Sequence, residues 1–324
     1  MPFAVAPKLE ADLRAGLVTV EEQLRESVKS DYEFVTETSH HLLAAGGKRF
    51  RPLLVLLAAH FADPSAPGVV PGAVAIELTH LSTLYHDDVI DEAVLRRGAE
   101  SANTRWTNTV AVLTGDFLFA RASEITADLG TEATRVLSRT IARLCEGEIR
   151  EAVGPQPGED PVDHYVQVVR DKTASLIATA ARFGTLLSGA DPATVEILTR
   201  YGERIGVAFQ LSDDILDVAS EEEQSGKTPG TDLREGVRTL PMLYALRDQS
   251  ANRLRELLAA DLATDDALHA EALATLRVHP AMEAARTTLR EWAEEARASL
   301  ATLSDGPARD TLDELCDFVV ERTA

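Results

Sequence analysis

Apolar side chains recur at intervals of three and four residues along almost the whole chain of 324 residues. The same spacing occurs near both ends, at Leu9, Leu13, Leu17 and Val20, and at Leu289, Trp292, Ala296 and Leu300. It places apolar groups on one face of an α-helix, and no segment alternates for long enough to predict a β-sheet. Pro and Gly gather in the segments 46–47, 63–72, 154–161 and 226–241, which we expect to connect the helices. The sequence therefore predicts an all-α fold.

No change in composition marks a linker between two halves of the chain, and no repeat of about 20 to 50 residues is present. Hydrophobic residues make up 45% of the chain and aromatic residues only 5%, a mixture that favours helices around a large core. We therefore expect one helical domain that spans residues 1–324.

Acidic residues outnumber basic ones by 53 to 32, which gives a formal net charge of −21. A protein that binds the phosphate backbone of a nucleic acid needs a basic face, so this class of partner is excluded. The longest apolar run, residues 53–59, is far shorter than the roughly 20 residues of a membrane-spanning helix, and no targeting segment is recognisable. We expect a soluble, cytoplasmic protein. Cys145 and Cys316 lie in no metal-binding pattern, so neither a disulfide framework nor a structural zinc site is indicated.

Two acidic clusters share the spacing D-D-x-x-D, and each follows an apolar stretch: Asp87, Asp88 and Asp91, and Asp213, Asp214 and Asp217. At about 100° per residue, the three carboxylates of each cluster occupy one narrow arc of a helix. A solvated acidic face would explain one such cluster, but two matching clusters favour metal binding. Mg²⁺ prefers carboxylate oxygens and typically bridges one or two of them to a substrate phosphate. The two boxes together therefore predict metal-assisted departure of a diphosphate.

Several cations lie beside glycines or near the two boxes, in the segments 46–52, 96–98, 172–173 and 226–228. Taken singly, each is more simply a solvated surface residue. Their placement beside the turns that flank both boxes favours diphosphate binding, since a helix start at a glycine-rich turn also attracts anions.

These motifs occur in a fixed order: G-K-R-F-R-P at 47–52, D-D-x-x-D at 87–91, R-R-G at 96–98, K-T at 172–173, F-Q-L-S-D-D-I-L-D at 209–217 and G-K-T-P-G-T-D-L at 226–233. From about residue 42 to residue 241, the chain resembles the trans-isoprenyl diphosphate synthases of the polyprenyl synthetase family, most closely those of medium or long product length. The resemblance implies a bundle of antiparallel helices around a deep central cavity, a homodimer, bound Mg²⁺, and two diphosphate substrates.

The resemblance also implies roles for individual residues. It implies metal ligands at Asp87, Asp91, Asp213 and Asp217, with Asp88, Asp214 and Lys172 as further catalytic residues. It implies an isopentenyl diphosphate site at Lys48, Arg51, His80 and Arg97, and an allylic diphosphate site at Arg96, Lys172, Thr173, Gln210 and Lys227. One departure is Val237, where the family commonly has a lysine; the neighbouring Arg238 is the candidate to supply this charge.

The implied reaction is ionisation, condensation and elimination, which joins isopentenyl diphosphate to geranyl, farnesyl or geranylgeranyl diphosphate and yields an all-trans polyprenyl diphosphate. Product length should depend on Ser82, Thr83 and Thr79, which precede the first box by one to two helical turns. All three are small, whereas enzymes of this family that stop at short products often carry an aromatic residue at the position of Ser82, so the resemblance implies a product longer than farnesyl diphosphate. Three aromatic side chains remained as an alternative floor for the cavity: Tyr85, Phe117 and Phe119.

Other functions remain open at this stage. His86 and Asp87 form an H-D pair such as helical metal phosphohydrolases use, and Glu77 with His80 forms an E-x-x-H motif such as carboxylate-bridged di-iron bundles use twice. A geranylgeranyl diphosphate synthase, a terpene cyclase and a non-catalytic partner subunit of a prenyl synthase also remain. Lys48, Arg51 and Arg97 favour condensation over cyclisation, since a cyclase does not need a second diphosphate site.

Overall fold

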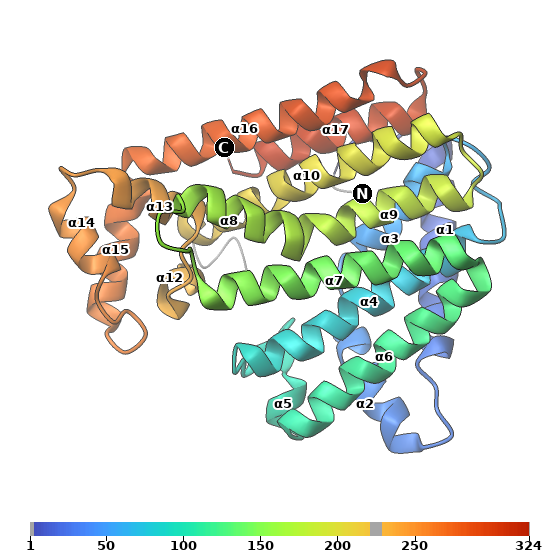
Figure 1. Cartoon of the computed structure of the whole chain (residues 1–324), viewed down its shortest axis with the longest axis horizontal. Helices are drawn as coiled ribbons and strands as arrows, with labels where there is room; N and C mark the ends of the chain where they lie inside the picture. The colour runs from blue at the N-terminus through green and yellow to red at the C-terminus, as the bar shows by residue number, and fades with distance from the viewer. Residues whose placement is uncertain (1–2, 221–228, 324) are drawn as a thin grey trace.

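The computed structural model describes residues 3–220 and 229–323, which form the helices drawn in Figure 1. The first half of the chain contains α1 (Pro7–Ser27), α2 (Glu33–Ala44), α3 (Phe50–Ala59), α4 (Val69–Ile90), β1 (Leu95–Arg96), β2 (Ala99–Glu100), α5 (Ala102–Arg105), α6 (Asn108–Leu129) and α7 (Thr131–Val153). The second half contains α8 (Pro161–Val169), a π-helical turn (Arg170–Ala174), α9 (Ser175–Leu187), α10 (Pro192–Ala219), α12 (Thr231–Glu235), α13 (Leu240–Arg247), α14 (Asn252–Leu258), α15 (Asp266–Arg277), α16 (Pro280–Ser299), a 3₁₀ turn (Leu300–Thr302) and α17 (Pro307–Glu321).

The predicted all-α fold is confirmed, because the only strands among the described residues are the two residues each of β1 and β2. These strands form one antiparallel hairpin whose turn consists of Arg97 and Gly98. Both turn residues have positive φ angles, 54° and 76°, as a two-residue hairpin turn requires. The hairpin follows the first acidic box directly, so Arg96 of β1 lies close to that box, while Arg97 occupies the turn.

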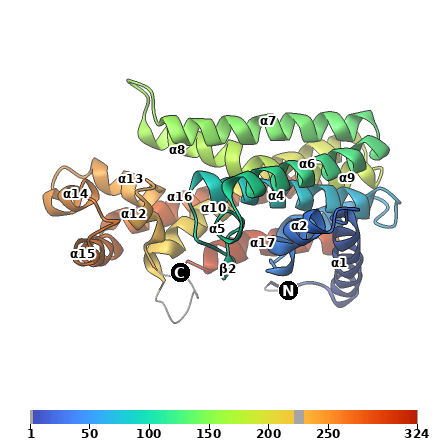
Figure 2. The ribbon, with the colours of Figure 1, turned by 90° about the horizontal axis from the view of Figure 1, so that it is seen from below.

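The core is centred on helices that are apolar on nearly every side. Residues 52–59 of α3 and residues 72–79 of α4 are buried without interruption. Helix α4 packs against α3, α6 and α9, and α10 packs against α9 and α16. In Figure 2, α4 and α10 lie between α7 on one side and α17 on the other. The two helices that carry the acidic boxes are therefore enclosed by the bundle.

Close packing of α3 and α9 depends on Gly184. A Cβ atom at this position would lie 2.3 Å from the carbonyl oxygen of Val55 and 2.7 Å from the Cβ of Ala58. Because the first of these atoms belongs to the backbone of a buried helix, no side-chain movement could relieve the contact. Within the described part of the chain, no helix is both long enough and apolar enough to span a membrane.

Candidate active site

The first acidic box lies at the C-terminal end of α4. Asp91 forms the C-cap of the helix, and its backbone N–H donates to the carbonyl oxygen of Asp87. Burial and the neighbouring carboxylate of Glu148 raise the pKa of Asp87 to about 7, although Lys172 opposes the shift. An ionised carboxylate at Asp87 is therefore costly unless additional positive charge is present.

Asp88 is completely buried beside the β1–β2 hairpin. Its Oδ1 accepts a hydrogen bond of 2.6 Å from Nε of Arg96, while its Oδ2 is buried and has no hydrogen-bond partner among the described residues. Burial raises the pKa of Asp88, and the bond from Arg96 opposes this shift. The R-R-G motif thus neutralises one carboxylate of the box directly, and one oxygen atom remains for a further cation.

The second box lies near the C-terminal end of α10, where Asp214 is almost fully buried. Its carboxylate accepts hydrogen bonds from the hydroxyl of Tyr165 and from Nε2 of Gln210, the latter at 2.8 Å. Burial nevertheless raises the pKa of Asp214 to about 7. Asp217 instead accepts from the backbone N–H groups of Thr231 and Asp232, each at 3.1 Å.

The two boxes face a common space. Partial burial raises the pKa of Glu235, the last residue of α12, and the carboxylates that raise it further are Asp91 of the first box and Asp217 of the second. In Figure 1, α4 and α10 direct their C-terminal ends toward the side of the bundle where α12 lies. The prediction that the two D-D-x-x-D motifs lie close together is therefore supported by both electrostatics and arrangement.

Lys172 and Thr173 lie in the π-helical turn between α8 and α9, a feature that the sequence did not predict. Such turns often mark functional sites because they redirect side chains within a helix. Nζ of Lys172 donates to Glu151 at 2.6 Å and to Glu148 at 3.0 Å, and the two carboxylates raise its pKa although burial opposes this. The hydroxyl of Thr173 donates to Oε1 of Gln210 at 3.0 Å, which connects the turn to the second box.

The π-helical turn lies directly against α7 at Gly147. A Cβ atom on Gly147 would lie 2.7 Å from the backbone nitrogen of Lys172 and 3.1 Å from the carbonyl carbon of Asp171. Backbone-to-backbone contact of this kind leaves little freedom for the position of Lys172. Glu148, the next residue on α7, pairs with Lys172 and also raises the pKa of Asp87.

The cations predicted to bind isopentenyl diphosphate gather around the loop between α2 and α3. Lys48 is exposed, whereas Arg51 is largely enclosed and its buried Nε has no hydrogen-bond partner among the described residues. Arg97 donates from the hairpin turn to the carbonyl oxygens of Leu42 and Gly46. Burial and the nearby positive charges of Arg51 and Arg97 hold the pKa of His80 well below its usual range. A neutral imidazole among several cations is suited to contact an anion.

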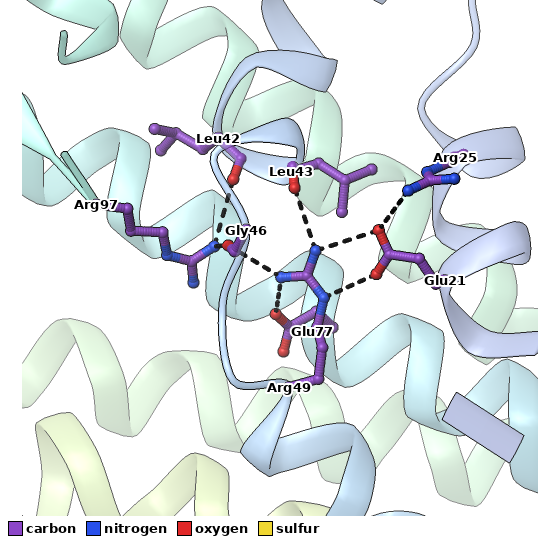
Figure 3. A network of polar contacts seen from close by, with 8 residues as sticks. All are labelled: Glu21, Arg25, Leu42, Leu43, Gly46, Arg49, Glu77 and Arg97. Atoms are coloured by element: carbon purple, nitrogen blue, oxygen red, sulfur yellow. Dashed lines mark hydrogen bonds and ion pairs between the residues drawn. The ribbon is translucent and has the colours of Figure 1, made fainter. Parts of the chain in front are cut away.

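Arg49, which lies between Lys48 and Arg51 in the sequence, has a structural role instead (Figure 3). Its guanidinium donates to Glu21 at 2.9 Å and to the buried Glu77 at 3.1 Å, and also to the carbonyl oxygens of Leu43 and Gly46. These contacts join α1, α4 and the loop that carries Lys48. Arg49 therefore fixes the shape of the loop rather than extending its positive surface.

The raised pKa values of Asp87 and Asp214 predict how stability depends on pH. Their pKa values are about 7 in the folded chain but near the ordinary value of about 3.9 when unfolded, so the folded state binds more protons between these limits. Stability without metal should therefore fall as pH rises, by about 1 kcal/mol per carboxyl between about pH 6 and about pH 8. Thermal unfolding in a chelator should show a lower midpoint at the higher pH. An unchanged slope in Asp214→Asn would contradict this explanation.

Two alternative metal sites disagree with the structure. The ring of His86 packs over Gly115 on α6, and its Nε2 lies 3.2 Å from the carbonyl oxygen of Val112 and 3.3 Å from Asp116. His86 thus faces α6, while Asp87 faces Glu148 and Lys172, so the pair does not act as a joint ligand set.

The E-x-x-H motif is likewise committed to other contacts. Glu77 is buried in an ion pair with Arg49, and His80 lies among arginines that disfavour a metal cation. The di-iron interpretation therefore has no support.

Residues expected to control product length lie on the buried part of α4. Thr79 and Ser82 are buried, and Thr83 is partly buried with its hydroxyl bonded to the carbonyl oxygen of His80 at 2.9 Å. Of the alternative floor residues, Tyr85 faces α2, where its hydroxyl donates to the carbonyl oxygen of Thr38.

Phe117 lies beside Arg121 on α6, and Phe119 is only partly buried. The hydrogen bond of Tyr85 to Thr38 on α2 turns its side chain toward that helix, which rules out Tyr85 as the floor of the cavity.

Two sequence expectations concern the segment after the second box. Lys227 lies outside the described residues. Val237 is partly exposed, and the neighbouring Arg238 is exposed in a hollow that Leu258 and Asp261 also line. Glu235, whose pKa is raised by burial and by Asp91 and Asp217, lines the same hollow.

Several residues of the site were missed by sequence reasoning, among them Glu148, Glu151, Tyr165, Glu235 and Arg322. Two of these had a local signal: Glu148 and Glu151 are three residues apart on one helical face. Arg322 had none, because it contacts Asp213 across 109 residues of sequence.

The donor set is compatible with Mg²⁺. No three His, Cys, Asp or Glu side chains within residues 3–220 and 229–323 form a preassembled metal cluster. Magnesium does not need one, because it usually takes one or two carboxylates together with water and substrate phosphates. The unpartnered Oδ2 of Asp88 and the uncompensated burial of Asp87 both indicate that positive charge is required at the first box.

Comparison with known proteins agrees with this arrangement. The family model described as Polyprenyl synthetase matches residues 32–276. The nonaprenyl diphosphate synthase of Mycobacterium tuberculosis is 47% identical over 96% of this chain and 94% of its own length. The heptaprenyl diphosphate synthase component 2 of Geobacillus stearothermophilus is 40% identical over 96% of this chain and 97% of its own.

Among solved structures, the geranylgeranyl pyrophosphate synthase of Corynebacterium glutamicum, complexed with calcium and isoprenyl diphosphate, superposes with a TM-score of 0.89. It is 41% identical and covers 99% of each chain. The family match over most of the chain, these relatives and the two facing acidic boxes lead to one conclusion: the chain belongs to the polyprenyl synthetase family and is a prenyltransferase that forms prenyl diphosphates.

Proposed function

We propose that the chain uses Mg²⁺ to condense isopentenyl diphosphate with an allylic diphosphate, and that its product is longer than farnesyl diphosphate. The observation that carries this proposal is that, besides burial, Asp91 of the first box and Asp217 of the second both raise the pKa of Glu235, while Lys172 opposes the rise that burial causes in the pKa of Asp87. Carboxylates from both boxes near one residue can hold metal and diphosphate together, whereas either box alone could be a solvated surface.

In this proposal, Asp87, Asp91, Asp213 and Asp217 hold the metal ions, and Asp88 and Asp214 support them. When bound, Mg²⁺ supplies positive charge that stabilises the departing diphosphate. The allylic diphosphate would also contact Arg96, Lys172, Thr173, Gln210 and Lys227. Lys172 is held in advance by Glu148 and Glu151, so its charge needs little reorganisation as the leaving group departs.

Isopentenyl diphosphate would bind to Lys48, Arg51, His80 and Arg97. Arg51 has an unpartnered Nε and Arg97 is fixed to the loop by carbonyl bonds, so one side chain is available and another is rigidly placed. Holding the double bond beside the allylic cation removes much of the entropic barrier to condensation. The departing diphosphate then accepts the proton, and no base from the protein is required.

Product analysis tests this proposal. Purified chain supplied with Mg²⁺, isopentenyl diphosphate and farnesyl diphosphate should form products longer than 15 carbons, and chelation of the metal should abolish them. Exclusive formation of farnesyl diphosphate from a shorter primer would contradict the chain-length assignment. A chain that is inactive alone but active with a second subunit would instead be a partner component.

Ser82 offers a sharper test of chain length. Replacing this small buried residue with Phe should shorten the product by one or more isoprene units, because the larger ring would fill space one turn below Asp87. Ser123→Phe on α6 provides a control for added bulk elsewhere. An unchanged product from a folded Ser82→Phe variant would show that Ser82 does not face the growing chain.

We also propose that the chain is one domain, cytoplasmic, and a homodimer. Support for the dimer comes from apolar side chains exposed on two adjacent helices, among them Leu113 on α6 and Ile149 on α7, which are 61% and 64% exposed. A second copy would cover such a surface. Light scattering that reports a monomer at working concentration would contradict the dimer.

A further inference from the structure

The C-terminal end of α17 places an arginine on the second acidic box. Arg322 forms the C-cap of this helix, and its guanidinium donates a hydrogen bond to Oδ1 of Asp213. The same guanidinium lies over the ring of Phe209, 4.9 Å from its centroid. Phe209 in turn stacks on Phe50, which precedes Arg51 in the isopentenyl diphosphate site. Arg322 thus lies where the two predicted substrate sites meet.

This contact has a direct chemical consequence for metal binding. Asp213 is one of the carboxylates proposed above as a metal ligand, and a metal ion at its Oδ1 would occupy the position of the guanidinium. The contact is only partly screened by solvent, since the side chains of Arg322 and Asp213 are 17% and 42% exposed. Asp214 differs, because its partners Tyr165 and Gln210 are neutral donors that can remain in place beside a metal.

Arg322 can leave Asp213 without disturbing the helix that carries it. The backbone next to it is held independently, because Nε of Arg286 donates to the carbonyl oxygen of Thr323 at 3.0 Å. A cation also remains favourable at the C-terminal end of α17 and over the face of Phe209. Rotation of one side chain would therefore suffice to free the carboxylate.

We propose that Arg322 is a competing counter-ion of the second box: it pairs with Asp213 in the metal-free enzyme and is displaced when metal binds. This inference rests on the proposed metal role of Asp213. The fraction of molecules with Asp213 free limits the apparent metal affinity, so removal of Arg322 should strengthen metal binding. A purely structural role for Arg322 predicts the opposite sign.

Metal binding in the absence of substrate tests this directly. Mn²⁺ serves as the probe, and free Mn²⁺ is measured by electron paramagnetic resonance during titration of the full chain. Arg322→Gln should bind Mn²⁺ about three- to tenfold more tightly than the unmodified chain, in keeping with a modest, partly exposed ion pair. Arg322→Lys keeps the positive charge, so its affinity for Mn²⁺ should lie between that of the unmodified chain and that of Arg322→Gln. Equal or weaker affinity in Arg322→Gln would overturn the proposal.

Two further variants separate the possible failures. Arg297 lies on α16 and pairs with Asp313 and Asp317 of α17, the helix that ends at Arg322, but it does not touch the second box. Arg297→Gln should therefore leave the affinity for Mn²⁺ unchanged. Tighter binding in Arg297→Gln as well would overturn the specific role of Arg322. Asp213→Asn should lose the affected site. If it binds as the unmodified chain does, the metal role of Asp213 fails; if only Arg322→Gln is without effect, the counter-ion role alone fails.

Discussion

Replacement of Asp87 by Ala should lower kcat by about 10²- to 10⁴-fold, because it removes a carboxylate that holds positive charge at the leaving diphosphate. The fold should survive the change. Burial already raises the pKa of Asp87 to about 7, so in the absence of metal the ionised side chain opposes folding at higher pH. Rates with saturating Mg²⁺ and the circular dichroism spectrum together measure both expectations.

Asp116→Ala is a suitable control for Asp87→Ala, because this aspartate lies on α6 with its side chain 60% exposed and should leave the rate nearly unchanged. The corresponding change in the second box, Asp213→Ala, should cause a loss of similar size. Near-normal activity in folded Asp87→Ala would exclude the first box as the metal site.

Replacement of Arg49 by Ala should destabilise the chain by about 3–5 kcal/mol, because it leaves the buried carboxylate of Glu77 without its ion pair. The same change removes donors to Glu21 and to the carbonyl oxygens of Leu43 and Gly46 (Figure 3). The urea midpoint should shift accordingly. Loss of activity should follow from loss of the folded state and from distortion of the loop that carries Lys48.

Two arginines provide controls for Arg49→Ala. Arg25 contacts the same Glu21 but is 60% exposed, so Arg25→Ala should change stability by less than about 0.5 kcal/mol. Arg51 is enclosed with an unpartnered Nε, so Arg51→Met should cost little stability while raising the KM for isopentenyl diphosphate. A destabilisation equal to that of Arg49→Ala in either control would contradict the assignment of the network.

The sequence predicted what depends on local spacing. Helices follow from apolar periodicity, and the arc of Asp87, Asp88 and Asp91 follows from helical geometry alone. Local spacing does not separate Arg49, which supports the fold, from Arg51, which only the family resemblance assigned to substrate, because the two arginines differ in the neighbours that tertiary packing brings to them. Such a difference arises from segments far apart in the chain.

The same reason explains why Tyr165, Glu235 and Arg322 were missed. Each contacts or influences a box from another helix: Tyr165 from α8, Glu235 from α12 and Arg322 from the end of α17. No periodic pattern in the sequence encodes such contacts between helices that are far apart along the chain. The π-helical turn at Lys172 was missed because its composition does not differ from that of an ordinary helical segment.

That turn also determines the packing of the helix that follows it. A π-helical turn contains one residue more than an α-helical turn, so every residue of α9 is rotated by about 100° from where an uninterrupted helix would place it. Gly184 meets the backbone of Val55 only in this register. If the turn closed as an ordinary α-helical turn with all of its residues kept, Phe183 would take the place of Gly184 against Val55, and Lys172 would move at the same time. The irregularity at Lys172 therefore cannot be straightened at constant chain length without also losing the close contact between α3 and α9.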